Sequence, residues 1–209
     1  MEAVGTIYKI QGNKAIIIAE VNPYVIEKQN IKTCLVKYDD GRVILSDQRR
    51  KIYALINDIS EYTGYNPNET KQVFKKLYAE KSEEEAFSLS DCSITTARNF
   101  ISFLIEFCVE NEVPTKKSLI GMTEEVGKYL YLCIGKKRCA ICGKKSNIYL
   151  CDAFDIGSEI TRSGDNEGRM AISLCSSCRK TNSDLVTLYD KYKLKAIKID
   201  EYICKKLCI

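Results

Sequence analysis

Two cysteine pairs decide what the sequence predicts about the fold: Cys139-Ala-Ile-Cys142, followed by Gly143, and Cys175-Ser-Ser-Cys178. In a CxxC spacing two thiolates face one metal ion from a tight turn, and two such pairs supply the four soft ligands of a tetrahedral zinc site. A redox role is the alternative, but a redox CxxC needs no second pair and belongs to a βαβ pattern that this sequence lacks. The spacing therefore predicts one structural Zn²⁺ per chain, bound by Cys139, Cys142, Cys175 and Cys178.

The composition excludes several kinds of chemistry and location. The chain has 209 residues and no histidine, so it has no Ser-His-Asp triad, no Cys-His nucleophile pair and no imidazole general base. No apolar run reaches the roughly 18–20 residues of a membrane span, and the N-terminus has no secretion leader. The 11 cysteines are an odd number, which argues against a disulfide framework. We therefore expect a cytoplasmic protein with reduced thiols.

Positive charge is concentrated toward the C-terminus. Residues 1–130 carry 17 basic and 19 acidic side chains, whereas residues 131–209 carry 15 basic and 9 acidic ones. Such an excess attracts polyanions through phosphate contacts and counterion release. The charge alone is explained equally well by a solvated, lysine-rich surface.

The order of strands and helices predicts an α+β protein. The runs VGTIYKIQ and KAIIIAEV around Gly12-Asn13, and IKTCLVKY and RVILS around Asp39-Asp40-Gly41, predict two hairpins. The apolar period then becomes helical, and Val73, Phe74 and Leu77 are expected to face the core. The predicted helices are 47–63 with Ser46 as N-cap, 67–80 with Asn66 as N-cap, about 95–113, 124–135, and two short ones at 182–192 and 200–207.

A domain boundary is expected near residues 130–137. There the helical pattern gives way to a glycine-containing, loop-like segment that has too few apolar residues to form a core without a metal. We predict an N-terminal domain of strands followed by helices at residues 1–132 and a small zinc domain at residues 133–209.

The segments around the cysteines read CAICGKKSNIYLCDAFDIG, RMAISLCSSCRKT and KYKLKAIKIDEYICKKLCI. A knuckle, a hairpin and a second knuckle that opens a helix follow one another in them. In this they resemble the HNH nucleases encoded by phages of Gram-positive bacteria, and the resemblance implies a treble-clef-like ββα zinc domain. In that family a His-His pair ends the first hairpin and further histidines follow the second knuckle. These residues bind a divalent metal ion and deprotonate the water that attacks a DNA phosphodiester.

Other residues occupy those catalytic positions here. Tyr149 and Leu150 stand at the His-His pair, Asn166 near the middle residue of the motif, and Arg179 where a metal-binding histidine would follow. Leucine exchanges no proton, and arginine is a permanent cation that only donates hydrogen bonds. The comparison implies a degenerate HNH domain without catalytic residues. The carboxylates that could replace the missing ligands, or could simply solvate a loop, are Asp152, Asp155, Asp165 and Glu167.

A second resemblance covers residues 42–114. These contain SDQRRK at 46–51, a Gly64-Tyr65 turn, a helix ending in KLYAE, and the entry SLSDCSITTAR before FISFLIEFCVENEVP. The order resembles the NinB (Orf) recombination mediators of phage lambda, which are dimers that bind single-stranded DNA and the host single-strand-binding protein. It implies a homodimer in the cytoplasm of a bacterial host, with a single-strand-binding protein or recombinase as partner.

Basic residues in both parts are expected to contact DNA. Three consecutive cations at a helix start oppose the helix dipole, which favours a phosphate or an acidic partner there, although a solvated helix cap is the alternative. The predicted contacts are Arg49, Arg50, Lys51, Arg98, Lys136, Lys137, Arg138, Lys144 and Lys145.

Three functions fit these observations. The first is a phage DNA-recombination accessory protein that binds single-stranded or branched DNA with a catalytically degenerate HNH domain. The second is a metal-dependent HNH-type endonuclease with a non-histidine site. The third is a protein-binding module that inhibits a host factor. We favour the first, and the sequence leaves enzymatic activity open.

Overall fold

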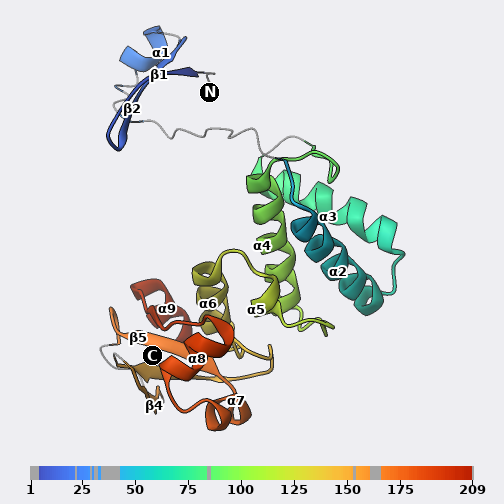
Figure 1. The fold of residues 1–209 in the computed structure, drawn as a ribbon, viewed down its shortest axis with the longest axis vertical. Coiled ribbons are helices and arrows are strands. Elements are labelled where there is room, and N and C mark those ends of the chain that lie inside the picture. The colour runs from blue at the N-terminus through green and yellow to red at the C-terminus, as the bar shows by residue number, and fades with distance from the viewer. Residues whose placement is uncertain are drawn as a thin grey trace. The chain divides into compact units, whose positions relative to one another are not determined.

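The computed structural model describes residues 5–21, 23–28, 30, 33, 43–83, 86–152, 154–160 and 166–208 (Figure 1). The chain divides into two compact units, Met1–Asp40 and Gly41–Ile209. The boundary expected near residue 132 lies inside the second unit, so the division into a helical and a zinc domain stays a prediction. Among the described helices, none is long and apolar enough to cross a membrane.

The first unit holds a β-hairpin of β1 (Gly5–Gln11) and β2 (Lys14–Ala19), followed by helix α1 (Pro23–Lys28). Gln11 pairs with Lys14 across the turn, where Gly12 has a φ of 60°, a conformation that favours glycine. This confirms the first predicted hairpin. The helix is unpredicted, because six residues are too few to show a helical period.

The second predicted hairpin falls mostly on residues 34–42, which lie outside the described residues. Of its last run, Val43 forms an isolated antiparallel bridge with Ser93, and Ser46 is already helical. Ser46 is therefore not the N-cap that the sequence predicts. The cap position is Leu45, whose backbone N–H donates to the Gln48 side-chain oxygen at 3.1 Å.

The helices of the second unit begin and end close to their predicted positions. Asn66 accepts from the Asn68 N–H at 2.9 Å, Ser93 caps its helix by accepting from the Thr96 N–H at 2.9 Å, and Gly64 ends the first helix with a φ of 78°. The helices are α2 (Ser46–Thr63), α3 (Pro67–Ser82), α4 (Ile94–Glu110), α5 (Leu119–Met122) and α6 (Val126–Gly135).

The helical core differs from the predicted one in α3. Val73 and Leu77 are 53% and 45% exposed, whereas Thr70, Phe74 and Tyr78 are buried. The buried stripe thus follows an i, i+4, i+8 spacing, and its aromatic rings pack edge-to-face with phenylalanines of α4. The sequence alone could not choose between the two stripes, because both contain large side chains.

In the described part of residues 136–208, the chain forms a four-stranded antiparallel sheet with three short helices (Figure 1). Side chains of α6 and β5, including Leu130 and Ile172, belong to one core that continues from the helices above. The predicted α+β class is confirmed. In the order β4-β3-β5-β6 the strands are β4 (Ile156–Glu159), β3 (Asn147–Cys151), β5 (Met170–Leu174) and β6 (Ile197–Lys198), with helices α7 (Ser176–Thr181), α8 (Leu185–Tyr192) and α9 (Glu201–Leu207).

Candidate metal centre and basic surface

The first cysteine pair lies in a tight turn between α6 and β3. The Cys139 N–H donates to the Lys144 carbonyl at 2.7 Å, and the Gly143 N–H donates back to the Cys139 carbonyl at 2.8 Å. Gly143 has a φ of 71°, so the glycine after the pair supplies the left-handed residue that the turn requires. The turn holds Cys139 buried and Cys142 exposed.

The second pair opens helix α7. Cys175 occupies the N-cap position, and its sulfur accepts from the Cys178 N–H at 3.4 Å. Its carbonyl accepts from the Arg179 N–H at 2.9 Å, which is the first helical hydrogen bond. A helix start therefore fixes the spacing of the two sulfurs and directs backbone donors at one of them.

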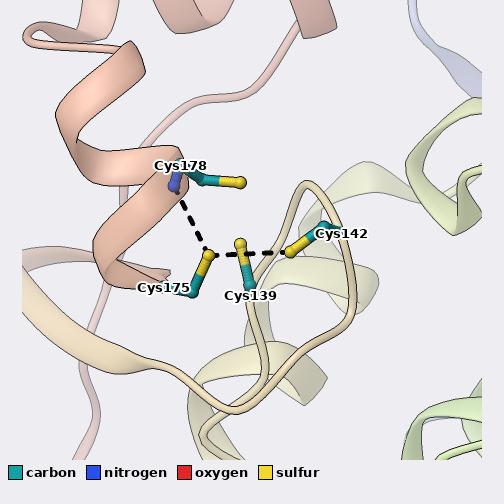
Figure 2. A group of neighbouring side chains, drawn as sticks. All are labelled: Cys139, Cys142, Cys175 and Cys178. Carbon is teal, nitrogen blue, oxygen red and sulfur yellow. Dashed lines mark hydrogen bonds between the residues drawn. The ribbon is translucent and has the colours of Figure 1, made fainter.

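The four predicted ligands come together, as Figure 2 shows. All four sulfurs lie within 4.8 Å of one another, and the Cys142 and Cys175 sulfurs are 3.6 Å apart. A tetrahedron with metal–sulfur bonds of about 2.3 Å requires sulfur separations of roughly 3.8 Å, so the geometry fits a tetrathiolate site. Within the described ranges no other group of three or more cysteines and carboxylates lies close enough to share an ion.

The local environment shifts the pKa values of the thiols in different directions. Burial raises the pKa of Cys139 and of Cys178. Burial opposes ionisation of Cys175 as well, but backbone and thiol hydrogen bonds from its neighbours outweigh it and lower the Cys175 pKa to about 7. A divalent ion held by these sulfurs would displace the remaining protons, because the thiolate is the metal-binding form.

Hydrogen bonds connect the candidate metal centre to the sheet and to the helices. The Ala140 N–H donates to the Ser173 carbonyl of β5 at 2.9 Å, and the Tyr129 hydroxyl of α6 donates to the Ala140 carbonyl at 3.0 Å. The Ser118 hydroxyl donates to the Ile141 carbonyl at 3.0 Å. A bound ion would therefore stabilise the contact between helical and sheet segments as well as the turn itself.

Two of the positions expected to be degenerate lie against each other. The Arg179 guanidinium is 5.6 Å from the centroid of the Tyr149 ring, donates to the Ile156 carbonyl of β4, and donates to the Ser183 carbonyl at 3.2 Å. Arg179 thus joins α7 to two strands. Leu150 is half-buried in β3, and Asn166 is buried in the turn that leads to β5.

In the described part of the chain, six of the nine predicted DNA contacts form side-chain hydrogen bonds or ion pairs within the protein. Arg49 donates to the Leu89 and Ser90 carbonyls, both at 2.9 Å. Lys51 and Arg98 lie 3.3 and 3.7 Å from the carboxylate of Glu124. Glu124 also accepts from the Gln48 side chain at 2.7 Å. The sequence prediction missed Glu124, because no local signal relates it to residues some 70 positions earlier.

The other predicted contacts fall into two groups. Arg50 pairs with Asp47 at 3.5 Å, Lys136 pairs with Glu110 at 2.6 Å, and Arg138 forms an ion pair with Glu112. The second group is exposed and lies on the first cysteine turn; it consists of Lys137, Lys144 and Lys145. We call these three residues the knuckle lysines. Their exposure leaves three ammonium groups of this turn accessible to a phosphate backbone.

A family model described as "Putative HNHc nuclease" matches residues 18–209, nearly the whole chain. The chain belongs to this HNH nuclease family. No curated protein and no solved structure matches it. The match confirms membership of an HNH nuclease family and also covers residues 42–114, where the NinB resemblance stays a prediction. Family membership supports a nuclease-like or DNA-related role and interaction with nucleic acid.

Proposed function

We propose that this HNH-family protein binds single-stranded or branched DNA without cleaving it, as an accessory protein of phage recombination in a bacterial cytoplasm. Zn²⁺ on the four cysteines holds a treble-clef-like domain at residues 133–209, and the NinB-like part at residues 1–132 forms a homodimer that meets a single-strand-binding protein or recombinase. In this proposal the protein binds and positions DNA and breaks no bond in it.

The Arg179–Tyr149 contact carries the proposal. The HNH resemblance places a metal-binding histidine at Arg179 and one of the paired histidines at Tyr149. Arg179 instead donates hydrogen bonds to two carbonyls and lies over the Tyr149 ring. A permanent cation that only donates hydrogen bonds neither ligates Mg²⁺ nor accepts a proton from water. The absence of histidine from the whole sequence removes the usual general base as well.

Zinc is the metal that suits the site best. Four thiolates in a tetrahedron favour Zn²⁺ over Mg²⁺, which requires oxygen ligands in octahedral geometry. A tetrathiolate site has no open position for a water nucleophile, so such an ion is structural. The knuckle lysines sit on this metal-held turn, where a rigid backbone would present them to phosphates.

One preparation of the full-length protein tests the proposal. We expect elemental analysis to give one zinc per chain, fluorescence anisotropy to give salt-sensitive binding to single-stranded and forked DNA, and no nicking of plasmid or forked DNA with Mg²⁺, Mn²⁺ or Ni²⁺. Metal-dependent cleavage would contradict the non-catalytic assignment. Absence of DNA binding at low salt would contradict the proposal as a whole and favour a protein-binding module.

A non-histidine endonuclease is the second candidate, favoured by the family itself. Asp152 and Asp155 are exposed and close the turn between β3 and β4, where the Asp152 N–H donates to the Asp155 carbonyl at 3.1 Å. One or two carboxylates together with substrate phosphates can hold Mg²⁺. Asp165 lies outside the described residues. This candidate predicts cleavage that disappears in Asp152→Asn and Asp155→Asn.

A further inference from the structure

A cleft of about 520 Å³ lies between helix α8, the end of β3, the start of β5 and residues 194–196. Its volume is within the range of small-molecule binding sites. Its apolar floor includes the buried residues Cys151, Leu194 and Ala196. Aromatic rings line its rim: Phe154 is 69% exposed and Tyr189 is 45% exposed. The cleft thus combines a buried, apolar floor with two aromatic side chains that are exposed to solvent.

The two aromatic residues are held by the backbone around them. The Leu185 N–H donates to the Phe154 carbonyl at 2.8 Å, which fixes the segment before β4 to the first turn of α8. Tyr189 lies one helical turn after Val186, another rim residue, so α8 presents both on the same face. Val186 and Tyr189 therefore stand on a regular helix, and a backbone hydrogen bond to that helix holds Phe154 in the segment before β4.

Lysines flank the aromatic rim. The ammonium groups of Lys193 and Lys195 lie 4.9 and 5.5 Å from the centroid of the Tyr189 ring. Both are exposed, while Leu194 and Ala196 between and after them are buried. The alternation in KLKA at residues 193–196 thus sends the two apolar residues into the floor and the two lysines to the surface. Asp152 is the acidic lining residue among those described.

A nucleotide matches this combination of groups. The flat face of a base covers an aromatic ring and displaces water from an apolar floor, and the phosphates on either side of it meet lysines. The carboxylate of Asp152 suits the exocyclic amino group of adenine, cytosine or guanine. An apolar peptide would use the floor and the rings but not the paired lysines, so the charges favour nucleic acid.

We propose that this cleft, formed by Phe154, Tyr189, Lys195 and the floor beneath them, binds one unpaired base of single-stranded DNA. The base stacks on the exposed aromatic rim, where it takes the place of the lysine ammonium groups over the Tyr189 ring, and Lys193 and Lys195 then contact the flanking phosphates. The inference deepens the proposed function and rests on it. It assigns to this face of the sheet domain a role in recognising bases, which a contact with phosphates alone cannot perform.

The test compares two oligonucleotides of equal length and charge, one of mixed sequence and one built from abasic nucleotides. Wild-type protein should bind the base-bearing strand about tenfold more tightly. Tyr189→Ala should lose most of that preference, Tyr189→Phe should keep it, and Lys195→Gln should weaken binding to both strands. The matched control is Tyr202→Ala, because Tyr202 is exposed in α9 with the Lys206 ammonium 5.6 Å from its ring centroid.

The possible results separate the inference from the proposed function. Equal affinity of the wild type for both strands, or a base preference that survives Tyr189→Ala, would overturn the inference and leave DNA binding intact. Wild-type protein that binds neither strand would overturn both. Because Tyr189 is nearly half exposed, we expect its substitution to leave the fold intact. Equal melting temperatures of the variants and the wild type would exclude a folding defect.

Discussion

The guanidinium of Arg179 lies 5.6 Å from the centroid of the Tyr149 ring. Arg179 comes from helix α7, which the second cysteine pair opens, and Tyr149 comes from β3, the first strand after the other pair. Hydrogen bonds to the Ile156 and Ser183 carbonyls extend the contact to β4 and to the segment before α8. One side chain therefore links three parts of the small sheet domain.

Arg179→Ala should destabilise the protein by about 1–3 kcal/mol, because two carbonyls lose a charged donor. Urea unfolding of the metal-loaded protein measures the change. The control is Lys180→Ala, since the neighbouring Lys180 is exposed; the substitution should stay within about 0.5 kcal/mol of wild type. Equal stability of the two variants would mean that the Arg179 contacts contribute nothing in solution.

Asp58 gives the stability a pH dependence of known sign. Burial raises its pKa, although the Lys116 N–H donates to its carboxylate at 3.1 Å. The folded state therefore holds this proton to higher pH than the unfolded state does, and stability falls as pH rises through the interval between the two pKa values. Asp58→Asn should be more stable than wild type at pH 7 and should lose that advantage well below pH 4, near and under the unfolded pKa.

Asp47 supplies the opposite control. The Lys51 ammonium next to it lowers the Asp47 pKa, so the ionised carboxylate contributes stability above its unfolded pKa and loses it in acid. Asp47→Asn should therefore be less stable than wild type at pH 7 and equal to it in acid. Chemical denaturation at both pH values measures the two variants. An Asp58→Asn variant that is less stable than the wild type at pH 7 would show that the hydrogen bond from the Lys116 N–H outweighs the cost of burying the carboxylate.

Local signals in the sequence predicted much of this structure. Asn66-Pro67 and Gly64 mark helix ends because their effects act within one turn of the backbone. The two CxxC spacings predicted that these four sulfurs come together in one candidate metal site, since each spacing fixes two sulfurs and the sequence has only one partner pair.

Contacts between distant residues could not be predicted in the same way. Lys51 and Glu124 are 73 positions apart, and no periodicity relates them, so Lys51 carried the same signal as a phosphate-binding lysine. The same holds for the cleft, whose rim residues Phe154 and Tyr189 come from different elements. The stripe that α3 buries depends on the phenylalanines of α4, which pack against Phe74 and Tyr78.

Removal of one sulfur tests the metal site. Cys142→Ser should lower bound zinc from one per chain toward zero, because a structural tetrathiolate contributes folding free energy only with all its ligands. Hydrogen exchange should then lose protection at the Cys139 and Ala140 amides, which are hydrogen-bonded in the native turn. Cys208→Ser is the control, since Cys208 is an exposed cysteine at the C-cap of α9. Unchanged metal content in Cys142→Ser would refute the site.

The knuckle lysines give the last prediction, which separates their role from that of charge in general. Replacing Lys144 and Lys145 with glutamine should weaken binding to single-stranded DNA and make the slope of log K against log salt less steep by about 1.4, since each phosphate contact on a single strand contributes about 0.7. The same change of charge at Lys75 and Lys76 of α3 is the matched control and should leave the slope nearly unaltered. Anisotropy titrations between 50 and 200 mM salt are sufficient to measure both pairs, because about this range produces large affinity changes in proteins with several phosphate contacts. If both pairs reduce the slope equally, DNA senses only the net charge of the protein, and the metal-held turn has no special place in the interface.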